Sequence, residues 1–211
     1  MTDTKGDRTR ERIVTTAAPL FNRLGYAGAS VADLMAAAGL EKGGLYRHFA
    51  SKEDIAVAAF DHAVRLHSER IRAHIAASPA SAAARMIAVA EGMASIAEDP
   101  VVVGGCPLLN TAIESDDAEG PLYPELRART RRAMSRLIST VRQMVIDGVD
   151  SGELRSTVDP DAEASTLVAV MEGALMLTKL YNDASHIRRA VAAVRDRANS
   201  LVARRGKSQA G

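Results

Sequence analysis

The sequence predicts an all-α protein with about nine helices. Its 211 residues are 47% hydrophobic but only 3% aromatic, and tryptophan is absent. This balance favours helices over a β-sandwich or a barrel. Apolar residues also recur at helical spacing from near the start of the chain, at Ile13, Ala17 and Phe21, as in a helix with one buried face. We expect a three-helix domain at the N-terminus and a larger helical domain after it.

The first two helices are delimited by glycine, serine and proline. The first helix carries an apolar stripe that runs to Leu24, with a kink expected at Pro19 and an end at Gly25. Ser30 is a good N-cap for a short second helix, and Gly39 is expected to end it. The chain therefore begins with a longer helix followed by a short one.

Prolines and polar stretches divide the rest of the chain. Ser51 is expected to cap the fourth helix, with acidic residues in its first turn. Helices are expected at about residues 42–49, 52–76, 80–98, 107–115 and 122–147. A turn with a short extended piece is expected within 150–161, and residues 205–211 are expected to form a disordered tail. The last two helices carry apolar residues at helical spacing, namely Ala164, Leu167, Met171 and Leu175, then Ile187, Val191, Val194, Ala198 and Leu201.

Charge is unevenly distributed along the chain. The net charge is only +1, but residues 1–52 carry eight Lys or Arg residues against five acidic ones. A partner made of phosphate would prefer this basic first quarter. The single cysteine, Cys106, excludes an intramolecular disulfide framework and favours a reducing compartment. The first twelve residues have no apolar signal core, and the uncharged run 100–113 is too short to span a bilayer, so we expect a cytoplasmic protein.

The stretch "AGLEKGGLYRHFASKED", residues 38–54, has the pattern of a helix-turn-helix. Gly39 permits the turn between the two short helices. We expect Leu40 and Leu45 to pack in the corner between them and Phe49 to pack back onto the first helix. Gly43 and Gly44 would leave a bare backbone face that can approach the wall of a DNA groove, with polar and cationic side chains close behind it.

Residues 30–55, "SVADLMAAAGLEKGGLYRHFASKEDI", resemble the TetR family of bacterial transcriptional regulators. The resemblance implies phosphate contacts from Ser30, Tyr46, His48 and Lys52, and base or groove contacts from Lys42, Gly43, Gly44 and Arg47. Two positions depart from the family pattern. Glu41 stands where a Ser or Thr cap is common, and Met35 replaces a residue that is usually small.

The resemblance also implies how the rest of the chain is organised. Residues 1–52 would form the DNA-binding domain, and residues 53–211 an effector-binding and dimerisation domain. The two C-terminal helices would pair with those of a second subunit in a four-helix bundle. The protein would be a repressor that a small molecule releases from a palindromic double-stranded operator. Candidate ligand-lining residues are Met86, Met93, Cys106, Leu109, Asn110, Tyr123, Met134, Met171, Met176 and Tyr181, with Asn110, Glu114 or Glu172 as polar handles.

Several alternatives stay open at this point. A methionine stripe is often plain core, and Cys106 can be either a reactive thiol or a buried inert one. The N-terminal arginines are either a solvated face or DNA-backbone contacts, and those at 127–136 are expected to be a solvated helix face. We expect no enzyme activity, no cofactor and no metal site, because the sequence has no nucleophile motif, phosphate loop or ligand-spaced His/Cys set. A DNA-binding protein without an effector, or an activator, is the alternative function.

Overall fold

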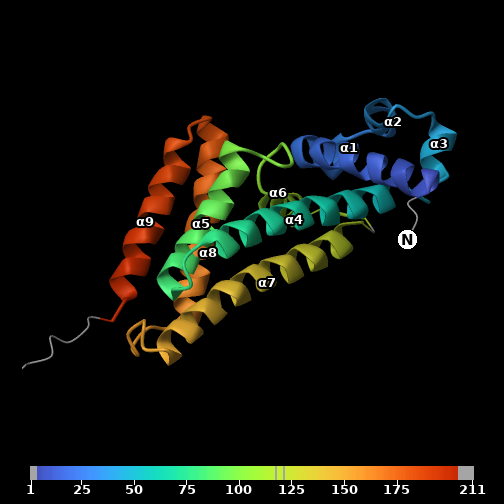
Figure 1. Ribbon diagram of the computed structural model, residues 1–211. Coiled ribbons are helices and arrows are strands. Elements are labelled where there is room, and N and C mark those ends of the chain that lie inside the picture. Colours follow the sequence, from blue (N-terminus) through green and yellow to red (C-terminus); the bar gives the residue numbers. More distant parts are fainter. Residues whose placement is uncertain (1–3, 117, 121, 204–211) are drawn as a thin grey trace, which may run out of the picture. The chain divides into compact units, whose positions relative to one another are not determined.

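The computed structural model describes residues 4–116, 118–120 and 122–203 (Figure 1). Within these ranges the chain forms nine α-helices and no strands, which confirms the all-α prediction. The helices are α1 (Lys5–Gly28), α2 (Val31–Ala38), α3 (Lys42–Tyr46), α4 (Lys52–Ala77), α5 (Ala82–Glu98), α6 (Pro107–Glu114), α7 (Leu122–Asp150), α8 (Pro160–Tyr181) and α9 (Ser185–Leu201). The tail expected at 205–211 lies outside the described residues.

The chain divides into two compact units. The first unit consists of Met1–Glu69 and Glu98–Met134, and the second of Arg70–Ala97 and Ser135–Gly211. The first unit therefore holds α1, α2, α3 and α6 together with parts of α4 and α7. The boundary predicted between residues 52 and 53 stays a prediction. None of the helices formed by the described residues combines the length and the apolarity needed to cross a membrane.

The first helix breaks at a glycine and not at its proline. Pro19 lies within α1, whereas Gly25 has a φ of 78° and interrupts the helix. One further turn, residues 26–28, follows this break, so Gly25 does not end the helix as expected. Leu24 is 48% exposed, which corrects the predicted stripe, and Tyr26 is buried in its place. The reversal of φ at Gly25 turns the chain so that the residue after the break faces the core.

The second unit is built on the packing of α8 against α9 (Figure 1). Four of the five residues of the predicted α9 seam are buried, namely Ile187, Val194, Ala198 and Leu201, whereas Val191 is half-buried. The extended piece predicted between α7 and α8 is a single antiparallel bridge between Leu154 and Val202. Next to Leu154, the Glu153 carboxylate accepts hydrogen bonds from the backbone N–H groups of α5 at Ala82 and Ala83, 2.7 and 3.0 Å long.

Candidate nucleic-acid interface

The α2 helix is fixed at both ends by local chemistry. Ser30 Oγ accepts a 3.1 Å hydrogen bond from the Asp33 N–H, and the Ser30 N–H donates to Asp33 Oδ2 over 2.8 Å. This reciprocal capping box satisfies N–H groups that a helix start leaves unpaired. The Ser30 hydrogen bonds, with a smaller contribution from Lys52, lower the pKa of Asp33. At the other end Gly39 adopts a left-handed conformation, with φ 61° and ψ 45°, which suits glycine.

The α3 helix is short and weakly capped. It spans Lys42–Tyr46, so the predicted helix over 42–49 ends three residues earlier than expected. Glu41 occupies the N-cap position but makes no side-chain capping hydrogen bond. A Cβ atom at Gly43 would meet nothing within 4 Å, so the backbone there faces open space. Another backbone, such as that of DNA, can therefore approach α3 closely.

Three apolar side chains hold α2 and α3 in place. Leu34 of α2 is 1% exposed, Leu45 of α3 is fully buried, and Phe49 is 6% exposed. Burial of side chains of this size stabilises each contact by about 1.5–3 kcal/mol. The predicted roles of Leu45 and Phe49 as core residues are confirmed. The helix pair therefore has a buried apolar side.

Apart from Ser30, whose hydroxyl caps α2, the polar side chains predicted to touch DNA lie on α3 and between α3 and the start of α4. Lys42, Gly43 and Arg47 are exposed, whereas Tyr46, His48 and Lys52 are half-buried. The side chains of Lys42, Tyr46, Arg47, His48 and Lys52 form no hydrogen bond or ion pair with the described part of the chain. Lys52 is the first residue of α4, whose N-terminus is capped by Ser51 through a 3.0 Å hydrogen bond from the Asp54 N–H. The hydrogen-bonding groups of this surface are therefore free for an external partner.

One arginine of the N-terminal cluster lies beside this surface. The Arg10 guanidinium stacks over the Phe49 ring, with its central carbon 4.7 Å from the ring centre. Such a cation–π contact restrains an exposed side chain without removing its charge. Arg10, His48 and Phe49 line one side of a groove of about 510 Å³, which Asp54, Asp61, Glu125 and Arg129 also line. Arg10 is thus held next to the predicted DNA contacts.

The second arginine cluster is a solvated helix face only in part. Arg131, Arg132 and Arg136 are exposed as expected, whereas Arg127 and Arg129 are half-buried. Arg127 Nε donates a 3.0 Å hydrogen bond to the Ser115 carbonyl at the end of α6. Arg129 bridges Asp61 of α4 and Glu125 of α7. Only the tertiary structure reveals Ser115 and Asp61 as partners, because they lie far from these arginines in the sequence, whereas Glu125 lies one helical turn before Arg129.

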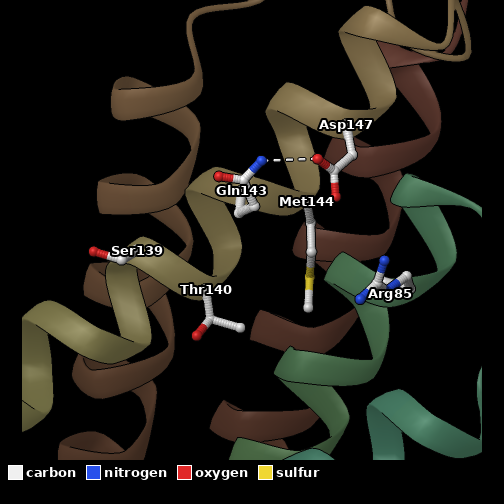
Figure 2. Close-up of a pocket in the computed structure, with 6 residues that line it drawn as sticks. All are labelled: Arg85, Ser139, Thr140, Gln143, Met144 and Asp147. Carbon is white, nitrogen blue, oxygen red and sulfur yellow. Dashed lines mark hydrogen bonds between the residues drawn. The ribbon is translucent and has the colours of Figure 1, made fainter.

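The predicted ligand-lining residues are spread over both units. Met86, Met93, Cys106 and Met171 are buried, Asn110 and Tyr123 are half-buried, and Met176 is 45% exposed. The Asn110 amide is already occupied, since it donates to the Asn22 carbonyl over 3.1 Å and to Asn22 Oδ1 over 2.8 Å. A hollow of about 370 Å³ lies elsewhere in the second unit (Figure 2). Its lining consists of Arg85 on α5 and Ser139, Thr140, Gln143, Met144 and Asp147 on α7.

Two family models match the chain. Residues 13–59 match "Bacterial regulatory proteins, tetR family", and residues 82–194 match "Tetracyclin repressor-like, C-terminal domain". The chain is also 25% identical over 175 residues to the HTH-type transcriptional repressor DhaR of Mycobacterium sp. (strain GP1), which covers 81% of this chain and 82% of that protein.

Solved structures share both the fold and much of the sequence. A TetR transcriptional regulator from Chloroflexus aurantiacus J-10-FL superposes with a TM-score of 0.88 at 44% identity, covering 94% of this chain and 98% of that one. A TetR-family regulator from Cytophaga hutchinsonii superposes with a TM-score of 0.87 at 28% identity, covering 97% of this chain and all of that one.

The fold and the exposed cationic surface define a helix-turn-helix transcriptional regulator. The chain belongs to the TetR family of bacterial transcriptional regulators. Members of this family are DNA-binding regulators and not enzymes, in agreement with the function predicted from the helix-turn-helix.

Proposed function

We propose that this regulator is a homodimeric repressor that covers a palindromic DNA operator and releases it when a small molecule binds. The observation that carries the DNA-binding part is the unengaged set of polar groups on α3 and at the start of α4. Lys42 and Arg47 are exposed, and Gly43 leaves the backbone beside them open. Side chains of this kind read base edges, while Tyr46 and Lys52 would bind phosphates.

A relative supports repression, and not activation, of transcription. DhaR, which matches about four-fifths of this chain, is described as a transcriptional repressor. A repressor acts by occupying the DNA that the transcription machinery needs. We propose that this chain is also a repressor. Its effector would bind the conformation that cannot bind DNA. Such coupling is commonly worth about 1–3 kcal/mol.

Dimerisation is supported by the exposed side of α8. Val170, Met176, Leu180 and Tyr181 are 40%, 45%, 69% and 64% exposed. At about 100° of rotation per residue, these positions fall within an arc of about 140° on the helix, together with the small residues Thr166, Ala169 and Gly173. A contiguous apolar surface of this kind indicates a protein interface. A second copy paired through α8 and α9 would place two α3 helices on half-sites about 34–36 Å apart.

Fluorescence anisotropy tests this proposal. Purified protein is titrated against DNA from upstream of its own coding region and against a scrambled duplex, each at two salt concentrations. We expect tight binding to the upstream DNA with a stoichiometry of one or two dimers per duplex, and weaker, more salt-sensitive binding to the scrambled DNA. Absence of binding to either duplex at low salt would contradict the DNA-binding role.

A further inference from the structure

The break in α1 leaves backbone groups without their helical partners. In a continuous helix the Tyr26 N–H would donate to the Asn22 carbonyl and the Ala27 N–H to the carbonyl four residues before it. Gly25, with φ 78° and ψ 167°, prevents this pairing. Two donors after the break and the carbonyls of Asn22 and Arg23 before it therefore lose their helical partners, and unpaired backbone groups that lie away from water are costly.

Side chains from α6 supply other partners for three of these groups. Glu114 Oε1 accepts hydrogen bonds from the Tyr26 N–H over 2.7 Å and the Ala27 N–H over 3.0 Å. The Asn22 carbonyl accepts a 3.1 Å hydrogen bond from Asn110 Nδ2. Asn110 and Glu114 lie four residues apart and thus on one face of α6. The α6 helix therefore satisfies both sides of the break in α1.

Further contacts strengthen the same junction. The Tyr26 hydroxyl lies 2.9 Å from Thr111 Oγ1, and its burial raises the pKa of the phenol so that it stays neutral. Asn22 Nδ2 donates to the carbonyls of Val103 and Gly105, 3.1 and 2.9 Å away, in the loop before α6. The junction between α1 and α6 thus consists of hydrogen bonds from Asn22, Tyr26 and Ala27 to α6 and to the loop before it.

The structure leaves little room for change at this junction. A Cβ atom at Gly25 would lie 2.9 Å from Glu114 Oε2, and one at Gly104 would lie 2.7 Å from the Asn22 carbonyl oxygen. Both glycines also have positive φ values, 78° and 118°. Larger residues at these positions would be strained by conformation and by contact.

The turn that Glu114 caps leads directly into the helix-turn-helix. Residues 26–28 are followed by the buried Ala29 and by Ser30, the N-cap of α2. Directly after Glu114, at the same end of α6, Arg127 of α7 donates to the Ser115 and Asp116 carbonyls. The direction in which the chain leaves α1 and enters α2 therefore depends on where α6 holds the Glu114 carboxylate.

We propose that Glu114 is a positioning residue for DNA binding, which transmits the position of α6 to the helix-turn-helix through its cap on Tyr26 and Ala27. The inference rests on the proposed DNA-binding function. Because coupling between two sites is reciprocal, DNA held by α3 must also stabilise the cap and α6.

Amide hydrogen exchange with and without the upstream DNA tests this coupling. In the unmodified protein, DNA should slow exchange in α3, at Tyr26 and Ala27, and in α6. In Glu114→Ala, DNA should still protect α3 but should no longer protect α6. Glu119→Gln, an exposed carboxylate in the following loop, is the control and should behave like the unmodified protein.

Operator binding gives a second readout. Glu114→Ala should weaken binding to the upstream DNA by about tenfold, as expected for loss of a helix cap, and leave binding to scrambled DNA unchanged. Glu114→Gln keeps one acceptor oxygen with almost the same shape, so it should fold even where the alanine variant does not, with a smaller loss. Protection of α3 without any protection of α6 in the unmodified protein would overturn the inference. Absence of protection in α3 itself would instead count against the proposed DNA binding.

Discussion

The helix-turn-helix and the α8 helix both expose large side chains, but these side chains differ in chemistry. The first surface exposes Lys42 and Arg47, whose charges are well solvated in water. The second exposes Leu180 and Tyr181, at 69% and 64%, where contact with water is unfavourable. The difference indicates two kinds of partner. A charged surface can bind and release DNA, whereas an apolar helix face favours a lasting contact with another protein chain.

The largest effect is expected on the apolar surface. Leu180→Glu places a charge in the proposed dimer interface and should weaken dimerisation by about 2–4 kcal/mol, as at a binding hot spot. Operator binding should fall with it, since one α3 helix alone reads only half a site. Analytical ultracentrifugation measures the monomer–dimer equilibrium. Ser135→Glu adds the same charge at an exposed position of α7 and should stay dimeric; a dimeric Leu180→Glu protein would contradict the proposed interface.

A change of sequence preference is the next largest effect. Arg47→Ala or Lys42→Ala should reduce the preference for operator over scrambled DNA by about 1–3 kcal/mol, because each would remove a base contact. Anisotropy titrations with single-base variants of the operator would locate the base pair at which discrimination is lost. Equal losses on all DNA sequences would mean that these side chains touch only phosphates.

Removing a phosphate contact is expected to weaken binding to all DNA sequences equally. Lys52→Ala should reduce binding to operator and scrambled DNA alike and lower the slope of log affinity against log salt by about one. Tyr46→Phe removes only a hydroxyl and should weaken binding uniformly without changing that slope. Titrations at several salt concentrations distinguish the effect of Lys52→Ala from that of Tyr46→Phe. If neither variant changed binding, the motif would be wrongly placed on the DNA.

The smallest effect concerns pH and the cap of α2. The Ser30 hydrogen bonds lower the pKa of Asp33 below 3.8, so this carboxylate stabilises the fold above that value and loses its contribution as pH falls through the lower folded-state value. Ser30→Ala should therefore be less stable than the unmodified protein at neutral pH, and this difference in stability should narrow as the pH falls below 3.8. Thermal denaturation of both proteins at each pH measures this difference in stability. Thr4→Ala removes the same kind of cap from Asp7 and should show the same trend.

Most of the helix boundaries could be predicted because their signals are local. Ser30 and Ser51 cap the helices that follow them, and Gly39 ends α2, as their positions before and after apolar runs predict. The apolar spacing of α9 likewise predicts its buried face. These features depend on residues at most a few positions apart, so the sequence displays both partners of each contact together.

The sequence by itself determined the helical class and the helix-turn-helix, because spacing, caps and glycines act within one or two turns. Only the tertiary structure decided that Leu24 is exposed, that Arg127 holds the end of α6, and that Glu114 caps a broken turn of α1. Glu114 and Tyr26 lie 88 positions apart, and no periodic pattern relates them. Their contact depends on where folding places two helices, which local chemistry does not specify.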